Sequence, residues 1–164
     1  MKTTYDASKI KEINGARIAI VQASWHKEHL EKMTGICSEI LRKAGAEVEI
    51  FVVPGTYEIP LAAKLLARQQ RYDAIAVFGI IHKGQTDHYE IILQTVIREL
   101  GKVMYDFEVP IIMEILPVHN IQHAIDRASG KGNKGIEAAQ AAIDIIRVRK
   151  EIEALIKVEK VGNF

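Results

Sequence analysis

Four short runs rich in valine and isoleucine constrain the fold of this chain more than any other feature. The runs are ARIAIVQA (16–23), VEIFVVP (48–54), AIAVFGII (74–81) and VPIIMEILP (109–117). Their apolar residues are nearly continuous rather than strictly alternating, which is typical of strands covered on both faces. The runs therefore predict a buried, parallel, four-stranded sheet.

Segments with the spacing of amphipathic helices lie between and after these runs. They cover 30–44, 61–66, 89–103, 120–128 and about 134–157. The resulting order, β-α-β-α-β-α-β-α-α, predicts an α/β fold in three layers, α/β/α, with right-handed crossovers. We expect a single domain over 16–160. Residues 1–15 are polar and are expected to stay out of the core, as an N-terminal arm that is mobile or lies against a neighbouring chain.

Composition narrows the class of protein. The chain has 22 basic and 21 acidic residues, for a net charge of +1, in an even mixture. A nucleic-acid partner is not expected, because it would need a clustered basic face. No apolar run approaches the roughly 18 residues of a membrane span, and residues 1–13 lack the apolar core of a signal peptide. We therefore expect a cytoplasmic protein with no membrane partner. The single cysteine, Cys37, excludes an intramolecular disulfide and falls in an apolar stripe, as a core residue would.

The expected fold also predicts where a ligand binds. Open parallel sheets bind ligands beyond the carboxyl ends of their strands. The segments that follow the four strands are Ser24–His26, Gly55–Glu58, His82–His88 and Pro117–His119. The only tryptophan, a tyrosine, a glutamate and several histidines therefore gather at one edge of the sheet.

Each of these residues also has a structural interpretation. Trp25 could cap the core, or it could stack on a flat ring. Glu58 could complement a helix dipole in the first turn, or it could bind a ligand. Gln85 and Thr86 lie where free amides open a helix and favour phosphate, although Thr86 could equally be a helix N-cap.

The histidines need a similar choice. His88 falls in the first turn of a helix, where an imidazolium is disfavoured, so a neutral imidazole that exchanges protons near pH 7 is plausible beside a purely structural role. The pairs His26/His29 and His119/His123 have metal-like spacing. No glutamate-containing zinc signature surrounds either pair, so a metal site is not expected.

Four blocks of the sequence carry a resemblance to a known family. They are the aromatic Trp25 after the first strand, PGTYEIP (54–60), GIIHKGQTDHYE (79–90) and HAIDRASGKGNKGIEAA (123–139). Together, over about 16–147, they resemble the 6,7-dimethyl-8-ribityllumazine synthase family of riboflavin biosynthesis. The resemblance implies a flavodoxin-like fold. It also implies a transferase that condenses 5-amino-6-(D-ribitylamino)uracil with 3,4-dihydroxy-2-butanone 4-phosphate, without a cofactor or a metal.

The resemblance also implies roles for particular residues. His88 would be catalytic and relay protons. Trp25 would stack on the pyrimidine, and the backbone of 80–82 would read the uracil edge. The residues implied for binding the ribitylaminouracil are Trp25, Thr56, Tyr57, Glu58, Ile80, Ile81, His82, Met113 and Lys134. Those implied for the butanone phosphate are Gln85, Thr86 and Arg127, whose guanidinium would clamp the phosphate through two hydrogen bonds.

Members of this family share each active site between neighbouring subunits of a pentamer. The resemblance therefore implies a homo-oligomer in which Met113, Arg127 and Lys134 come from the partner chain. Arg127, which the sequence pattern alone leaves as a surface charge, gains a role in this way.

The chain departs from the family pattern at several positions. Met113 stands where the family usually has phenylalanine, and Glu-Ile-Leu-Pro at 114–117 replaces Gly-Val-Leu-Thr. His-Lys at 82–83 replaces Ile-Arg, and Trp-His at 25–26 replaces Phe-Asn. Two alternatives stay open beside catalysis: a non-catalytic protein that binds riboflavin or lumazine on the same fold, and a structural shell protein. The retained His88 and Arg127 favour catalysis, because a riboflavin binder needs neither.

Overall fold

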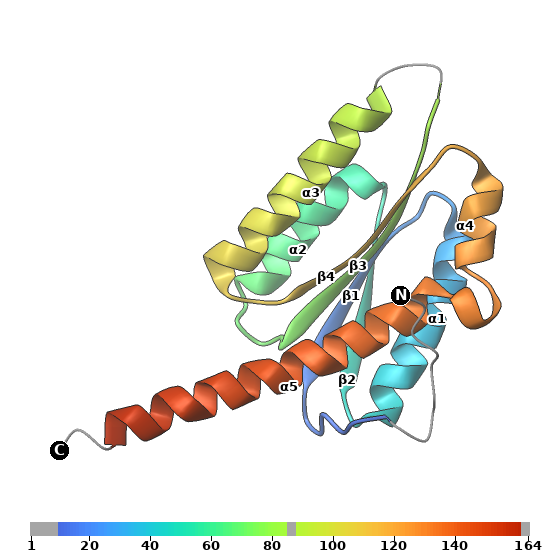
Figure 1. The fold of residues 1–164 in the computed structure, drawn as a ribbon. Coiled ribbons are helices and arrows are strands. Elements are labelled where there is room, and N and C mark those ends of the chain that lie inside the picture. The colour runs from blue at the N-terminus through green and yellow to red at the C-terminus, as the bar shows by residue number, and fades with distance from the viewer. Residues whose placement is uncertain (1–9, 85–87, 162–164) are drawn as a thin grey trace.

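The structure, a computed structural model, describes residues 10–84 and 88–161, with side chains as far as residue 156. It contains one all-parallel sheet in the order β2-β1-β3-β4 (Figure 1). The strands are β1 (Arg17–Ala23), β2 (Glu47–Val53), β3 (Ala74–His82) and β4 (Ile111–Val118). The prediction of a four-stranded parallel sheet is confirmed.

Helices cover both faces of this sheet. They are α1 (Lys27–Lys43), α2 (Ile59–Ala67), α3 (His88–Phe107), α4 (Ile121–Arg127) and α5 (Lys134–Val161), with 3₁₀ turns η2 (Thr56–Glu58) and η3 (Gly130–Gly132). Helices α2 and α3 pack together on one face, and α1 and α5 pack together on the other (Figure 1). The predicted three-layer, flavodoxin-like sandwich is therefore confirmed.

The core lies in the two central strands and the helix faces against them. Strand β3 is buried from Ala74 to Ile81, and β1 is buried from Ile18 onward. Cys37 is buried in α1, as the apolar stripe predicts. Burial on both faces explains why these two runs are nearly continuous in apolar residues.

Strand β2 differs from the prediction that all four runs are covered on both faces. Ile50 is 45% exposed and Val52 is 57% exposed. Strand β2 lies at the edge of the sheet and pairs only with β1, so its outer side has no strand beside it in the described chain. An apolar run predicts a strand, but it does not predict whether that strand is central.

The expected N-terminal arm is also shorter than predicted. Ile13 is only 2% exposed and belongs to the core. Its backbone N–H donates to the carbonyl oxygen of Ala44 at 2.8 Å, and the N–H of Gly15 donates to that of Gly45 at 3.1 Å. The expectation that all of 1–15 stays out of the core is therefore wrong at Ile13. Residues 1–9 lie outside the described residues.

Helix α5 has two different halves. Its first half packs closely on α1 through small residues, among them Gly135, Ala138 and Ala142, all of them buried. Its second half extends past the body of the molecule (Figure 1) and exposes Ile152 and Leu155. Within the described residues, no helix has the length and apolar character needed to cross a membrane.

Candidate functional site

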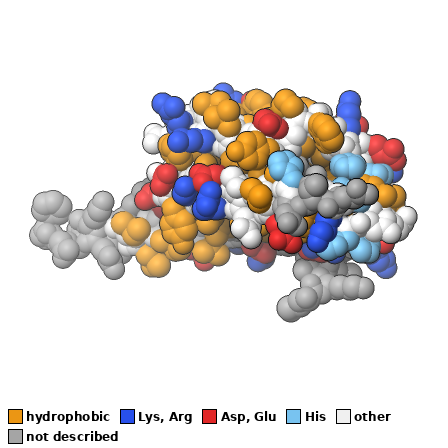
Figure 2. All heavy atoms as spheres, turned by 90° about the horizontal axis from the view of Figure 1, so that it is seen from above, with side chains coloured by type: hydrophobic (Ala, Val, Ile, Leu, Met, Phe, Trp, Pro, Cys, Tyr) orange, Lys and Arg blue, Asp and Glu red, His pale blue; other side chains and the backbone are white. Residues whose placement is uncertain are grey.

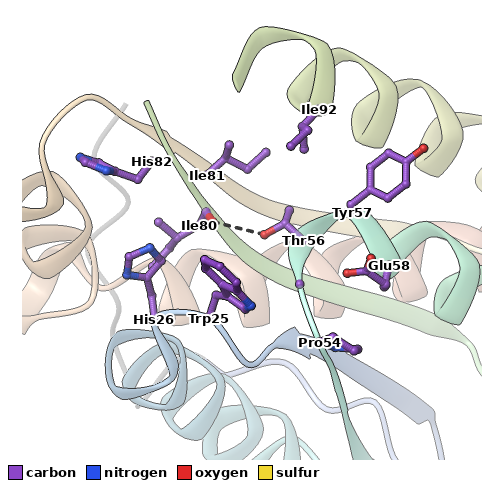
Figure 3. Close-up of a pocket in the computed structure, with 11 residues that line it drawn as sticks. Trp25, His26, Pro54, Thr56, Tyr57, Glu58, Ile80, Ile81, His82 and Ile92 are labelled. Atoms are coloured by element: carbon purple, nitrogen blue, oxygen red, sulfur yellow. Dashed lines mark hydrogen bonds between the residues drawn. The ribbon is translucent and has the colours of Figure 1, made fainter. Parts of the chain in front are cut away.

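A pocket of about 640 Å³ opens at the carboxyl ends of the strands, where the sequence analysis placed the ligand site. It is lined by Trp25, His26, Pro54, Gly55, Thr56, Tyr57, Glu58, Ile80, Ile81, His82 and Ile92. Figure 3 shows two histidines on one side of the pocket and Tyr57 with Glu58 on the other. Its lining is mostly apolar with a few polar groups, which is the usual make-up of a site for a small organic molecule.

The corner between β1 and α1 forms one wall. Ser24 Oγ donates to the carbonyl oxygen of Pro54 at 2.7 Å, so this corner is tied to the end of β2. Trp25 follows and is 72% exposed, which rules out the role of a core cap. Its ring is instead a pocket wall that a flat ligand can stack on.

His26 lines the same wall. From the sequence it was a residue at a strand end, one half of a possible metal pair and a departure from the family pattern, and no binding role was predicted for it. It has φ 61°, a left-handed conformation that is rare for residues with a side chain. Partial burial lowers the pKa of His26 first, and the nearby His29 and His82 lower it further. Its position directly after Trp25 at a strand end was the signal that could have identified it.

The turn η2 forms the opposite wall. Thr56 is buried and its Oγ1 donates to the carbonyl oxygen of Ile80 at 3.2 Å. A Cβ added at Gly79 would lie 2.7 Å from Thr56 Oγ1, so glycine is needed there for close approach. The Thr56 side chain therefore locks η2 onto β3, and its hydroxyl is already engaged in a hydrogen bond.

Tyr57 and Glu58 complete this wall, and both are exposed. A Cβ added at Gly55 would lie 2.9 Å from Glu58 Oε2, so the carboxylate folds back over Gly55. No side-chain hydrogen bond caps the first turn of α2 at Glu58. The carboxylate is therefore placed at the pocket wall, where it can accept hydrogen bonds from a polar ligand.

The end of β3 forms the floor. Pairing between β1 and β3 stops at Gln22 and Phe78, whereas β3 stays paired with β4 as far as His82 and Val118. Beyond Phe78 the backbone of β3 on the β1 side therefore faces the pocket instead of a strand. Ile80 and Ile81 are buried, and His82 is exposed beside His26.

All six histidines of the chain lie at or after the carboxyl end of a strand: His82 ends β3, and the other five follow β1, β3 or β4. Figure 2 shows histidine side chains on this face beside hydrophobic ones. His88 is the exposed first residue of α3, and Ile92, one turn later, lines the pocket. Tyr89 turns inward, and its ring meets that of His119 edge-on with centroids 5.9 Å apart. Gln85 and Thr86 lie outside the described residues.

Four of the expected site residues within the described chain do not line this pocket: His88, Met113, Arg127 and Lys134. Met113 is 41% exposed at the β4 edge of the sheet. Arg127 is exposed at the end of α4, and its guanidinium donates to the carbonyl oxygen of His123 at 3.1 Å. Lys134 opens α5 and forms an ion pair with Glu137. One chain thus brings together the walls of a pocket but not these four side chains.

Glu114 is a candidate functional residue that was not predicted as part of the site. From the sequence it was only a departure from the family pattern. Burial raises its pKa from 4.5 to about 7, Lys134 opposes that rise, and Glu137 adds to it. A glutamate inside an apolar strand was the signal available in the sequence, because a buried carboxylate usually has a partner. Within the described chain, no three or more His, Cys, Asp or Glu residues cluster closely enough to hold a metal ion.

Residues 15–150 match the family model described as 6,7-dimethyl-8-ribityllumazine synthase. The chain belongs to this family. The match covers the whole sheet, the pocket and the first half of α5. The family comprises transferases of riboflavin biosynthesis, so the chain is an enzyme of that class. The resemblance stated from the four sequence blocks is therefore confirmed.

Proposed function

We propose that this enzyme condenses 5-amino-6-(D-ribitylamino)uracil with 3,4-dihydroxy-2-butanone 4-phosphate to give 6,7-dimethyl-8-ribityllumazine, phosphate and water. The observation that carries the proposal is the pocket itself. An exposed tryptophan, the exposed carboxylate of Glu58 and a stretch of β3 backbone with no strand beside it on the β1 side meet at one strand edge. These groups suit a flat, polar ring with a hydroxylated side chain.

The pocket supports a role for each wall in binding the pyrimidine substrate. Trp25 would stack on the ring, and the β3 backbone from Ile80 to His82 would bond to the polar edge of the uracil. Thr56 would contribute its backbone, since its hydroxyl is engaged with Ile80. Tyr57 and Glu58 would hold the ribityl hydroxyls. Such positioning of two substrates can supply about 7–11 kcal/mol of the lowering of the barrier.

His88 would move protons during imine formation, phosphate elimination and ring closure. Its exposed position at the start of α3, one turn before Ile92, supports access to a bound substrate. General acid–base help of this kind is worth roughly 10²–10⁴-fold in rate. Gln85 and Thr86 would bind the phosphate together with Arg127.

We further propose that the working enzyme is a homopentamer with shared sites. Met113, Arg127 and Lys134 are not among the residues that line the pocket of their own chain. If these side chains serve the reaction, a neighbouring subunit must present them to the pocket. In a ring of heterologous contacts, each subunit presents one surface to the next subunit and a different surface to the previous one.

The test is to mix the two substrates with purified protein, and to follow the absorbance and fluorescence of the lumazine together with released phosphate. We expect one phosphate for each lumazine formed. Tight riboflavin binding without any lumazine would contradict the proposal and indicate a flavin-binding protein. Assemblies without turnover or binding would indicate a shell protein.

A further inference from the structure

The local structure at His26 does not account for a histidine at this position. His26 is the N-cap residue of α1 and has φ 61°, a left-handed conformation that is uncommon for residues other than glycine. The preferred N-caps are serine, threonine, aspartate and asparagine, because their side chains accept from a backbone N–H of the first turn. The side chain of His26 makes no such hydrogen bond. Residues held in uncommon backbone conformations cluster at functional sites, so we looked for the role of this imidazole in the pocket.

The pocket places His26 at one end of the space open to a ligand. The residue is half-buried and lines the pocket on the side opposite Glu58 (Figure 3). His82 lines the same side from the end of β3. The two histidines lie four residues beyond Gln22 and Phe78, the last pair that joins β1 to β3 in register. Two neighbouring strand ends thus bring two imidazoles to one end of the pocket.

The lining indicates which kind of ligand this end of the pocket suits. Among the described residues, no lysine or arginine lines it, and the carboxylate of Glu58 stands at the opposite wall. Partial burial lowers the pKa of His26, and His29 and His82 lower it further, so the imidazole is chiefly neutral at pH 7. A neutral imidazole offers one N–H donor and one acceptor nitrogen. The histidine end therefore suits a neutral, polar ring better than a phosphate group.

We propose that His26 is a further substrate-binding residue, whose imidazole forms a hydrogen bond with the ring of the ribitylaminouracil that stacks on Trp25. The proposal rests on the proposed function, in which Trp25 and the β3 backbone bind this ring. It gives the substrate two polar contacts at opposite ends of the pocket: His26 holds the ring, and Glu58 holds the hydroxyls of the side chain. It gives His26 no part in the capture of the phosphorylated substrate.

Steady-state kinetics of His26→Gly test the proposal, because glycine removes the imidazole and suits a left-handed N-cap. KM for the ribitylaminouracil should rise by roughly threefold to tenfold, the worth of one hydrogen bond. KM for the butanone phosphate and kcat should stay almost unchanged. His26→Gln, which keeps a donor and an acceptor, should recover most of the loss. An unchanged KM for the ribitylaminouracil, or a rise only for the phosphorylated substrate, would overturn the proposal.

Gln70→Gly is the matched control. Gln70 is exposed in the turn between α2 and β3, has φ 52° and does not line the pocket. In both variants the relief of a left-handed side chain offsets the freedom that glycine adds to the unfolded chain, so the urea midpoint should stay close to that of the wild-type protein. Gln70→Gly should change neither KM. An equal rise in KM for the ribitylaminouracil in both variants would overturn the proposal, because it would not depend on the imidazole.

Equilibrium binding of 6,7-dimethyl-8-ribityllumazine is a second readout that needs no turnover. Fluorescence titration should show a dissociation constant raised by roughly threefold to tenfold in His26→Gly. Since His26 and Glu58 hold different ends of the ligand, the losses in His26→Gly and Glu58→Ala should multiply in the double variant. Unchanged lumazine affinity in His26→Gly would overturn the proposal. If the wild-type protein makes no lumazine but these losses occur, the proposed function fails while the role of His26 in binding the ring stands.

Discussion

At the scale of single residues, Trp25 presents most of its ring to the pocket and little to the core. It is 72% exposed, so its replacement should leave the fold intact. Trp25→Ala should weaken binding of the proposed product, 6,7-dimethyl-8-ribityllumazine, because a ring contact is worth about 0.5–1.5 kcal/mol beyond the area it buries. Fluorescence titration with this lumazine measures the change. Trp25→Phe keeps a ring and should recover most of the affinity; equal affinity for all three proteins would contradict a stacking role.

His88 is expected to assist the reaction without being indispensable. Removing a proton relay costs roughly 10²–10⁴-fold in kcat, whereas the positioning of two substrates remains in place. His88→Ala should therefore turn over slowly but measurably in the two-substrate assay. If a folded His88→Ala protein, checked by circular dichroism, had no turnover at all, the importance assigned to positioning would be wrong.

Glu114 should make the free energy of unfolding depend on pH. Its pKa is 4.5 when unperturbed and about 7 in the folded chain, so the folded state binds the proton more tightly. Stability from this group is fully present below pH 4.5 and is lost as the pH rises to 7, by about 3 kcal/mol at most. Urea unfolding at pH 5 and pH 8 should show this loss in the wild-type protein but not in Glu114→Gln. Parallel behaviour of the two proteins would contradict it.

At the scale of elements, the contact between α1 and α5 depends on a glycine. A Cβ added at Gly135 would lie 2.0 Å from the backbone oxygen of Met33, so the helices must separate. Gly135→Ala should cost about 1–3 kcal/mol by overpacking. Gly101 in α3 has no neighbour within 4 Å of an added Cβ, and Gly101→Ala should instead gain about 0.5–1 kcal/mol. Thermal unfolding of both variants tests the contrast, which fails if the two changes have the same sign.

The elements themselves could be predicted from the sequence to a large extent. The runs at 16–23 and 74–81 are nearly continuous in apolar residues because β1 and β3 are covered on both faces. Their lack of alternation therefore predicts burial on both faces directly. The apolar pattern of a strand does not show how many strands lie beside it, and so the position of β2 at the exposed edge of the sheet was not predicted. Ile13 was missed for a similar reason, since two isoleucines in a polar segment, Ile10 and Ile13, are too few to establish a period.

The candidate site was predictable only in part. The strand-end rule located Trp25 and Glu58, because it depends on the order of elements and not on contacts. The hydrogen bond of the Thr56 hydroxyl to β3, and the influence of Lys134 on the pKa of Glu114, depend on residues distant in sequence. No pattern within one segment carries that information.

At the scale of the whole molecule, we expect a pocket on one chain to work with side chains from its neighbour. Sedimentation should therefore find an oligomer built from pentamers, and conditions that dissociate it should abolish turnover while the chain remains folded. A fully active monomer would contradict the shared site.

The most direct test of the central claim, a lumazine synthase whose active site is shared between chains, is a mixed oligomer. Glu58→Ala damages the pocket, and Arg127→Ala damages the surface presented to a neighbour, so each variant alone should be nearly inactive. When the two are assembled together in equal amounts, about a quarter of the sites should combine an intact pocket with an intact arginine. We predict lumazine formation well above the sum of the two variants. Activity no greater than that sum, in oligomers shown to contain both chains, would contradict the account.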